Sequence, residues 1–264
     1  MMPLHIGTVR RFLTSALAVL LCALTVAPVA HADLADLLPR IKPSVVAIGT
    51  YQRTRSPAFR FLGTGFVVGN GRTVATNAHV IPDTLATDQL EALVVVLPGQ
   101  EPGQTARQAT RIATDRNHDL ALLRLEGEQR LPALPLGEAE VREGQQIAFT
   151  GFPIGNALGV TPVTHRGIIA AITPIGIPQG NARDLNPTLV RRLGGGAFLV
   201  YQLDATAYPG NSGSPLFDPN TGTVIGIVNM VFVKSTKESV LSDPSGISYA
   251  IPVEHLRALL AGAP

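Results

Sequence analysis

The segment 209–215, Pro-Gly-Asn-Ser-Gly-Ser-Pro, places one serine between glycines directly before the apolar pair Leu216-Phe217. Such a loop presents a hydroxyl group at its tip. A serine hydroxyl becomes a good nucleophile only when a neighbouring base accepts its proton. The same residues are also good turn composition. Taken alone, the segment leaves a nucleophilic Ser212 and a plain polar turn equally open.

A candidate base and a candidate carboxylate lie upstream of this loop. His79 follows Thr-Asn-Ala, after the predicted strand 65–68 and the polar turn 69–72, and Asp119 directly precedes the apolar strand 120–125. A partly buried carboxylate can accept the proton-bearing nitrogen of an imidazole, fix its tautomer and stabilise the imidazolium ion. Each residue by itself is better explained as a structural or turn residue. Together with Ser212, they supply a nucleophile, a base and an orienting group.

Short apolar runs rich in Val, Ile, Thr and Phe recur at strand length between turn residues. Their spacing favours an all-β sandwich or barrel over an alternating βα architecture. Helical periodicity occurs only near the two ends of the chain that follows the leader, at 32–38 and 252–261. The predicted strands are 45–51, 65–68, 93–97, 120–125, 146–150, 163–172, 198–203, 224–233 and 247–251.

A polar segment bearing Pro and Gly, 126–140, separates two similar sets of strands. We therefore predict two domains, 33–132 and 133–264. The loop 174–196 is long for a connection in a compact β protein, and such loops are usually functional or mobile. A regulatory or substrate-binding role for it and an exposed insertion without a role stay equally open.

The first 32 residues have the organisation of a signal peptide. Arg10 and Arg11 precede an apolar run, 12–27, and Ala30-His31-Ala32 places small residues on both sides of a cleavage point. A membrane anchor is the alternative, but the run is shorter than the roughly 18 to 20 residues of a spanning helix. We predict cleavage after Ala32, no stable membrane anchor, and a location in the bacterial periplasm or outside the cell.

Charge gives no support for a nucleic-acid partner. Removing residues 1–32 takes two basic residues and no acidic residue from the 21 basic and 19 acidic residues of the chain. The mature chain is then formally neutral, whereas a polyanion partner calls for clustered Lys and Arg.

Cysteine and histidine usage excludes two kinds of site. The single cysteine, Cys22, lies inside the predicted leader, so we expect no disulfide and no thiol nucleophile in the mature chain. The four histidines that remain have no metal-binding spacing, and we predict no metal and no other cofactor. Besides His79, we expect His118 to point away from Asp119, His165 to be structural and His255 to lie at the surface.

Three segments, taken as a set, resemble the trypsin-like peptidases and most closely the HtrA/Deg-type bacterial proteases. They are Thr-Asn-Ala-His-Val at 76–80, His-Asp-Leu-Ala-Leu at 118–122, and the run from Asp204 through Pro-Gly-Asn-Ser-Gly at 209–213. The order His, Asp, Ser is the chain order of chymotrypsin-type proteases. The resemblance spans about 45–260, and we expect no PDZ domain to follow it.

The resemblance implies a fold and an activity. The fold is two six-stranded antiparallel Greek-key β-barrels with a short C-terminal helix, with the active site between the barrels. The activity is that of a serine endopeptidase acting on polypeptides through His79, Asp119 and Ser212, with the N–H groups of Gly210 and Ser212 forming the oxyanion hole. An oligomer is possible on this basis but is not implied.

Departures from the family pattern bear on specificity. Ser214 is similar to the glutamyl-endopeptidase and exfoliative-toxin branch, but Val228 and Asn229 stand where that branch has its glutamate-binding histidine. By family analogy, Thr206, Val228 and Asn229 line the primary pocket, and none is charged. An uncharged wall cannot compensate a buried charge, so we expect cleavage after small or medium apolar residues. A glutamyl-endopeptidase-like protease and a catalytically silent binding module on the same fold are the alternatives.

Overall fold

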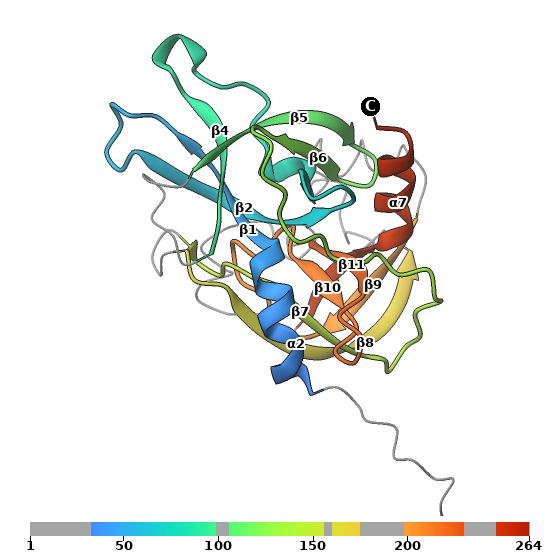
Figure 1. Cartoon of the computed structure of the whole chain (residues 1–264). Helices are drawn as coiled ribbons and strands as arrows, with labels where there is room; N and C mark the ends of the chain where they lie inside the picture. The colour runs from blue at the N-terminus through green and yellow to red at the C-terminus, as the bar shows by residue number, and fades with distance from the viewer. Residues whose placement is uncertain (1–32, 99–105, 156–159, 175–197, 230–246, 264) are drawn as a thin grey trace, which may run out of the picture. The chain divides into compact units, whose positions relative to one another are not determined.

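The computed structural model describes residues 33–98, 106–155, 160–174, 198–229 and 247–263. The predicted signal peptide and nearly all of the loop 174–196 lie outside the described residues. Figure 1 shows the strands in two groups, and its colours let the reader follow the chain from one group to the other. The helices and strands are α2 (Leu34–Ile41), β1 (Val45–Tyr51), β2 (Phe59–Val68), β3 (Thr73–Asn77), β4 (Ala92–Val96), β5 (Arg107–Asp115), β6 (Leu120–Leu125), β7 (Gln146–Gly151), β8 (Val163–Pro174), β9 (Leu199–Asp204), β10 (Pro215–Phe217), β11 (Val224–Asn229), β12 (Ile247–Pro252) and α7 (Val253–Ala261), with short 3-10 turns at Lys42–Ser44, Ala78–Val80 and Thr87–Gln89.

The first six strands close into a barrel in the order β1-β2-β3-β6-β5-β4, and every pairing is antiparallel. Apolar side chains pointing inward from these strands fill its core, including those of Val46, Val67, Val74, Val95 and Leu123. Burial of this apolar surface is the main force that closes the barrel.

The last six strands close into a second antiparallel barrel in the order β10-β11-β12-β9-β8-β7. Its core contains Phe149, Ile169, Leu203, Leu216 and Val228. The prediction of an all-β chain with two six-stranded antiparallel barrels and a short C-terminal helix is confirmed.

Several strands differ from their predicted bounds. β1 and β6 agree with the prediction, but β2 begins at Phe59, six residues before the predicted start, and pairs along the whole of β1. No strand was predicted at β3, β5 or β10. β5 alternates exposed polar and half-buried residues instead of forming an apolar run, and β10 has only three residues.

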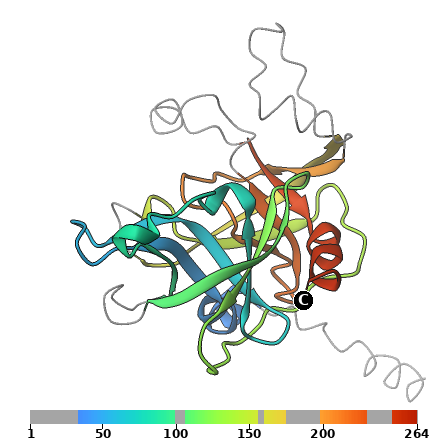
Figure 2. The same ribbon diagram turned by 90° about the horizontal axis from the view of Figure 1, so that it is seen from above.

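The two helices that the structure describes connect the barrels. α2 is capped by Asp33, whose carboxylate accepts a hydrogen bond from the Ala35 N–H, and it runs three residues beyond the predicted end. Its buried residues Leu37 and Ile41 pack against Gly222 in the β10–β11 turn of the second barrel, although α2 leads into the first. α7 contacts β5 and β6 of the first barrel and β11 and β12 of the second (Figures 1 and 2). Within the described part of the chain, neither helix is long and apolar enough to cross a membrane.

The connection between the barrels, 126–145, touches both of them. Leu134 donates its N–H to the Val67 carbonyl of the first barrel at 2.9 Å, and Leu136 bridges to Val224 of the second. The domain division between 132 and 133 stays a prediction.

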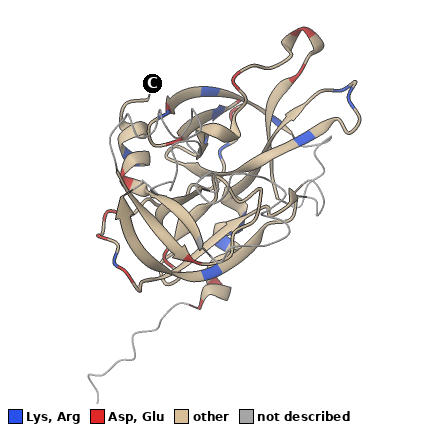
Figure 3. Cartoon of the chain, turned by 180° about the vertical axis from the view of Figure 1, so that it is seen from behind, with Lys and Arg blue, Asp and Glu red and all other residues tan. Residues whose placement is uncertain are grey.

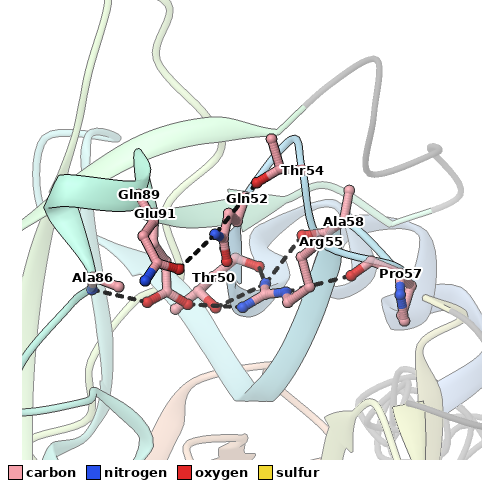
Figure 4. A network of polar contacts seen from close by, with 9 residues as sticks. All are labelled: Thr50, Gln52, Thr54, Arg55, Pro57, Ala58, Ala86, Gln89 and Glu91. Atoms are coloured by element: carbon pink, nitrogen blue, oxygen red, sulfur yellow. Dashed lines mark hydrogen bonds and ion pairs between the residues drawn. The ribbon is translucent and has the colours of Figure 1, made fainter.

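A polar network holds the β1–β2 hairpin to the segment that precedes β4 (Figure 4). The guanidinium of Arg55 lies 2.8 Å from the Glu91 carboxylate and donates to the Thr50 and Ala58 carbonyls at 2.8 and 3.0 Å. Glu91 also accepts the Ala86 N–H. The hydrogen bond from the Thr50 hydroxyl, together with those from Ala86 and Arg55, lowers the pKa of Glu91.

Candidate active site

The Asp119 carboxylate fixes the turn that carries His79. His79 Nδ1 lies 2.7 Å from Asp119 Oδ2, and the backbone N–H of His79 donates to Oδ1 at 3.0 Å. The Ala78 N–H donates to the Asp119 carbonyl at 2.9 Å, and the Asn77 side-chain amide donates to the same oxygen at 3.1 Å. The end of β3 and the start of β6 are thereby joined through both the backbone and the side chain of Asp119.

This geometry assigns the His79 tautomer. An ionised carboxylate only accepts hydrogen bonds, so Nδ1 must be the donor to Asp119. In the neutral imidazole, Nε2 is then the nitrogen with a free lone pair, and it can accept a proton. The His79 side chain is 28% exposed and the Asp119 side chain 4%, so the carboxylate is the more buried group of the pair.

Asp119 has a left-handed backbone, with φ of 55°. Asp is one of the few residues besides Gly that are found in this region. The conformation turns the chain directly before β6, where the sequence predicted a carboxylate at the strand start.

The second barrel supplies another donor to the same carboxylate. Asn229, the last residue of β11, donates from Nδ2 to Asp119 Oδ2 at 2.8 Å, and both residues are buried. The sequence placed Asn229 in the substrate pocket, and no pattern in it indicated this contact across the barrels. A wall role for Asn229 in that pocket stays a prediction.

The loop that carries Ser212 is anchored to β2 of the first barrel. The Thr64 N–H donates to the Ser212 carbonyl at 2.9 Å, and the Thr64 hydroxyl donates to the Gly210 carbonyl at 2.6 Å. At Gly213, with φ of 86°, an added Cβ would lie 2.0 Å from the Thr64 carbonyl oxygen. Only glycine fits this close approach of two backbones.

The Ser212 loop and the His79 turn meet at Gly63. A Cβ added there would lie 2.8 Å from a methyl group of Val80, the residue after His79, and 3.2 Å from the Ser212 carbonyl oxygen. Among the described residues, no hydrogen bond joins the Ser212 hydroxyl to the His79 ring. Catalytic hydrogen bonds are often long before substrate binds.

The other predicted site residues lie around this loop. Within the described part of the chain, neither the Gly210 N–H nor the Ser212 N–H has an acceptor. Thr206 lies just after β9 and is half-buried, and Val228 is fully buried in the second barrel core. The segment around Thr206 is held by Ser248 of β12, whose hydroxyl donates to the Ala205 carbonyl at 2.9 Å. Sequence reasoning missed Ser248 because it is one small polar residue inside an apolar run.

A separate aromatic cluster lies next to the Asp119 turn. His118 Nδ1 lies 2.5 Å from the Asp115 carboxylate, and the His118 ring stacks on His255 of α7 at a centroid distance of 3.8 Å. Phe198 contacts both rings edge-on. The expectation that His255 lies at the surface was wrong, because its side chain is only 19% exposed. The sequence of a helix indicates which of its faces is polar, but not which residues of other elements pack against that face.

His165 packs inside the second barrel, where its ring stacks on Phe149 at 4.8 Å. Burial lowers its pKa. In the residues that the structure describes, no three His, Cys, Asp or Glu side chains gather in a way that could hold a metal ion. Figure 3 shows basic and acidic residues interspersed along the described ribbon.

Comparison with known proteins places the chain in a family. Residues 63–227, more than half of the chain, match the family model for the trypsin-like peptidase domain, and this range contains His79, Asp119 and Ser212. The chain belongs to the trypsin-like peptidase family, as its motifs predicted.

Its relatives are HtrA/DegP-type serine proteases. It is 33% identical over 197 residues to a protein of Halomonas elongata named probable periplasmic serine endoprotease DegP-like, covering 74% of this chain and 33% of that protein. It is 32% identical over 231 residues to the mitochondrial serine protease HTRA2 of Bos taurus, covering 86% and 42%. The chain thus spans less than half of the length of these relatives.

A solved structure, the serine endoprotease from Yersinia pestis, has the same fold. It superposes with a TM-score of 0.59 at 24% identity and covers 87% of this chain and 66% of that one.

The contact between Asn229 and Asp119 predicts a defect in turnover. Asn229→Leu removes a hydrogen bond to a charged group, which contributes about 1.5 to 3 kcal/mol. If His79, Asp119 and Ser212 act as a triad, we expect kcat to fall roughly 10- to 100-fold with KM within about threefold, because positioning of these residues affects the transition state more than substrate binding. Steady-state kinetics on a peptide substrate separate the two constants. A variant with unchanged kcat and a raised KM would instead show that Asn229 acts only as a pocket wall.

The His118–His255 stack predicts acid-sensitive folding. Burial and the neighbouring His118 lower the pKa of His255 below its usual 6.5, although Glu254 and Asp115 act in the opposite direction. Below about pH 6.5 the unfolded chain therefore binds more protons at this residue than the folded chain, and stability falls as pH falls. His255→Phe keeps a stacked ring without a charge. The urea midpoints at pH 7.5 and 5.5 should differ less for this variant than for the wild type. If the two proteins showed the same difference between the two pH values, His255 would not be the source of the acid sensitivity.

Proposed function

We propose that the chain is an exported serine endopeptidase in which Ser212 attacks the scissile carbonyl, His79 accepts its proton, and Asp119 orients His79. The observation that carries this proposal is the pair of hydrogen bonds from His79 to the Asp119 carboxylate, which leaves Nε2 as the proton acceptor. Membership of the trypsin-like peptidase family supports the same roles.

The reaction proceeds in two steps on this arrangement. His79 Nε2 takes the proton of the Ser212 hydroxyl as its oxygen bonds to the carbonyl carbon, and then gives that proton to the leaving amine. The acyl-enzyme formed on Ser212 is hydrolysed by water with His79 again as the base. Asp119 stays ionised and stabilises the imidazolium ion.

The developing oxyanion needs donors that are already in place. We assign this role to the N–H groups of Gly210 and Ser212, neither of which is used by an acceptor in the described part of the chain. Each such donor typically contributes about 100- to 1000-fold in rate. No metal or organic cofactor is required by this chemistry.

Export is a further part of the proposal. The leader-like residues 1–32 and the description of relatives such as the Halomonas protein as periplasmic both support it. The substrates we propose are polypeptides, in keeping with relatives named endoproteases.

Labelling with a fluorophosphonate tests the nucleophile. We expect the wild type to be labelled once, at Ser212, and Ser212→Ala to be unlabelled. Hydrolysis of an unfolded protein should fall about a million-fold in Ser212→Ala and His79→Ala, the scale found for another triad protease. Ser214→Ala is the matched control because Ser214 is a buried serine two residues away in the same loop. A folded wild type with no serine-dependent labelling would favour the binding-module alternative.

Cleavage of a peptide library tests specificity. Because Thr206, Val228 and Asn229 carry no charge, we propose that the residue before the cut bond is small or medium and apolar. Mass spectrometry of the products should show most cuts after such residues. A majority of cuts after Glu, Lys or Arg would overturn this pocket, and a majority after Glu would favour the glutamyl-endopeptidase alternative.

A further inference from the structure

Within the described residues, the peptide between Pro209 and Gly210 is hydrogen-bonded from one side only. The Ile154 N–H, in the turn after β7, donates to the Pro209 carbonyl at 2.7 Å. This peptide bond is trans, so its C=O and N–H groups point in opposite directions. The contact therefore aims the Gly210 N–H away from Ile154, and no acceptor takes it up within the described residues.

Gly210 cannot select this orientation by itself. Its φ is 102°, and glycine adopts positive and negative φ about equally well. If the peptide turned over, the Pro209 carbonyl oxygen would point where the Gly210 N–H now points. That oxygen would repel a negative charge instead of stabilising it. A contact outside the glycine must therefore hold the peptide in the donating orientation.

Ile154 makes this contact from an unfavourable backbone conformation. Its φ is 50°, in the left-handed region, which β-branched residues rarely adopt. Such outliers persist only where the surrounding structure imposes them, and they cluster at functional sites.

Two sets of contacts hold the segment before and after Ile154. The Phe152 N–H donates to the Thr64 hydroxyl oxygen at 3.1 Å, and the same hydroxyl donates to the Gly210 carbonyl at 2.6 Å. One threonine of the first barrel thus binds both the 152–155 turn and the Ser212 loop.

The ring of Phe61 packs against the same two segments. It meets Phe152 edge-on at a centroid distance of 6.4 Å. A Cβ added at Gly155 or at Gly210 would lie 3.0 Å from this ring. The turn and the loop are therefore packed on one aromatic side chain, which leaves Ile154 little room to relax.

We propose that Ile154 is a positioning residue for the oxyanion hole: its left-handed backbone points its N–H at Pro209 and so keeps the Gly210 N–H available to the substrate. This inference rests on the proposed function of Gly210. If Ile154 relaxed into an ordinary backbone conformation, the 209–210 peptide could turn over. The oxyanion hole would then lose the Gly210 N–H, while His79, Asp119 and Ser212 would stay in place.

Backbone replacements at residue 154 test the inference. Exchange of Ile154 for its α-hydroxy acid replaces the N–H group with an ester oxygen, which cannot donate a hydrogen bond, and keeps the side chain. We expect kcat to fall about 100-fold, as when one oxyanion donor is lost, with KM within about threefold and an unchanged pH profile. Ile154→Pro, which lacks the N–H and cannot adopt a positive φ, should show the same loss.

Ile154→Gly is the matched control. It keeps the N–H and adopts a φ of 50° without strain, so kcat should stay within about threefold of the wild type. Urea unfolding of each variant shows that it is folded before its kinetics are compared. If Ile154→Pro does not fold, the α-hydroxy acid variant alone decides.

Two results would overturn the inference: a folded α-hydroxy acid variant with wild-type kcat, or an Ile154→Gly variant as slow as the α-hydroxy acid variant. Either result leaves the proposed function standing as long as the wild type is labelled at Ser212. Failure of the proposed function is recognised separately, by a wild type that is neither labelled nor active.

Discussion

The structure depends on a carboxylate that is buried between two barrels. An ionised carboxylate taken out of water needs several donors, because its desolvation otherwise costs more than folding can offset. Asp119 has donors from both sides: the backbone and ring of His79 in the first barrel, and Asn229 in the second. The need to supply this carboxylate with donors therefore both brings the two barrels together and orients the imidazole of His79.

The same closure leaves no space for side chains where the barrels touch. A Cβ added at Gly213 would lie 2.0 Å from the Thr64 carbonyl oxygen across the contact, and one added at Gly151 would lie 3.0 Å from the Thr64 hydroxyl oxygen. Thr64 uses its N–H, its hydroxyl and its carbonyl to bind the Ser212 loop and the strand that leads to His79. Short backbone distances, rather than large interlocking side chains, fix the geometry of the site.

Sequence reasoning reached the parts of this arrangement that depend on local pattern. The apolar runs predicted β1 and β6, and the motifs around His79 and Asp119 indicated two side chains that the structure brings within 2.7 Å. Strands without an apolar run, such as β5, were missed. The catalytic roles of these residues stay proposals.

Contacts between segments that lie far apart in the chain could not be predicted from the sequence. Asn229 was assigned to the pocket because the resemblance to the family indicates its position along the chain but not which residue it contacts. His255 was expected at the surface because nothing in α7 shows that His118 stacks on it. The left-handed backbone of Ile154 has no sequence signal, since isoleucine argues against that conformation.

A crystal structure of the chain with a peptidyl boronate would show whether Ser212, His79 and Gly210 act together as proposed. We expect a covalent bond from boron to Ser212 Oγ, with one boronate oxygen within hydrogen-bonding distance of the Gly210 and Ser212 nitrogens and the other near His79 Nε2. A boronate bonded to another residue, or one whose oxygen faces the Pro209 carbonyl instead of the Gly210 N–H, would contradict it.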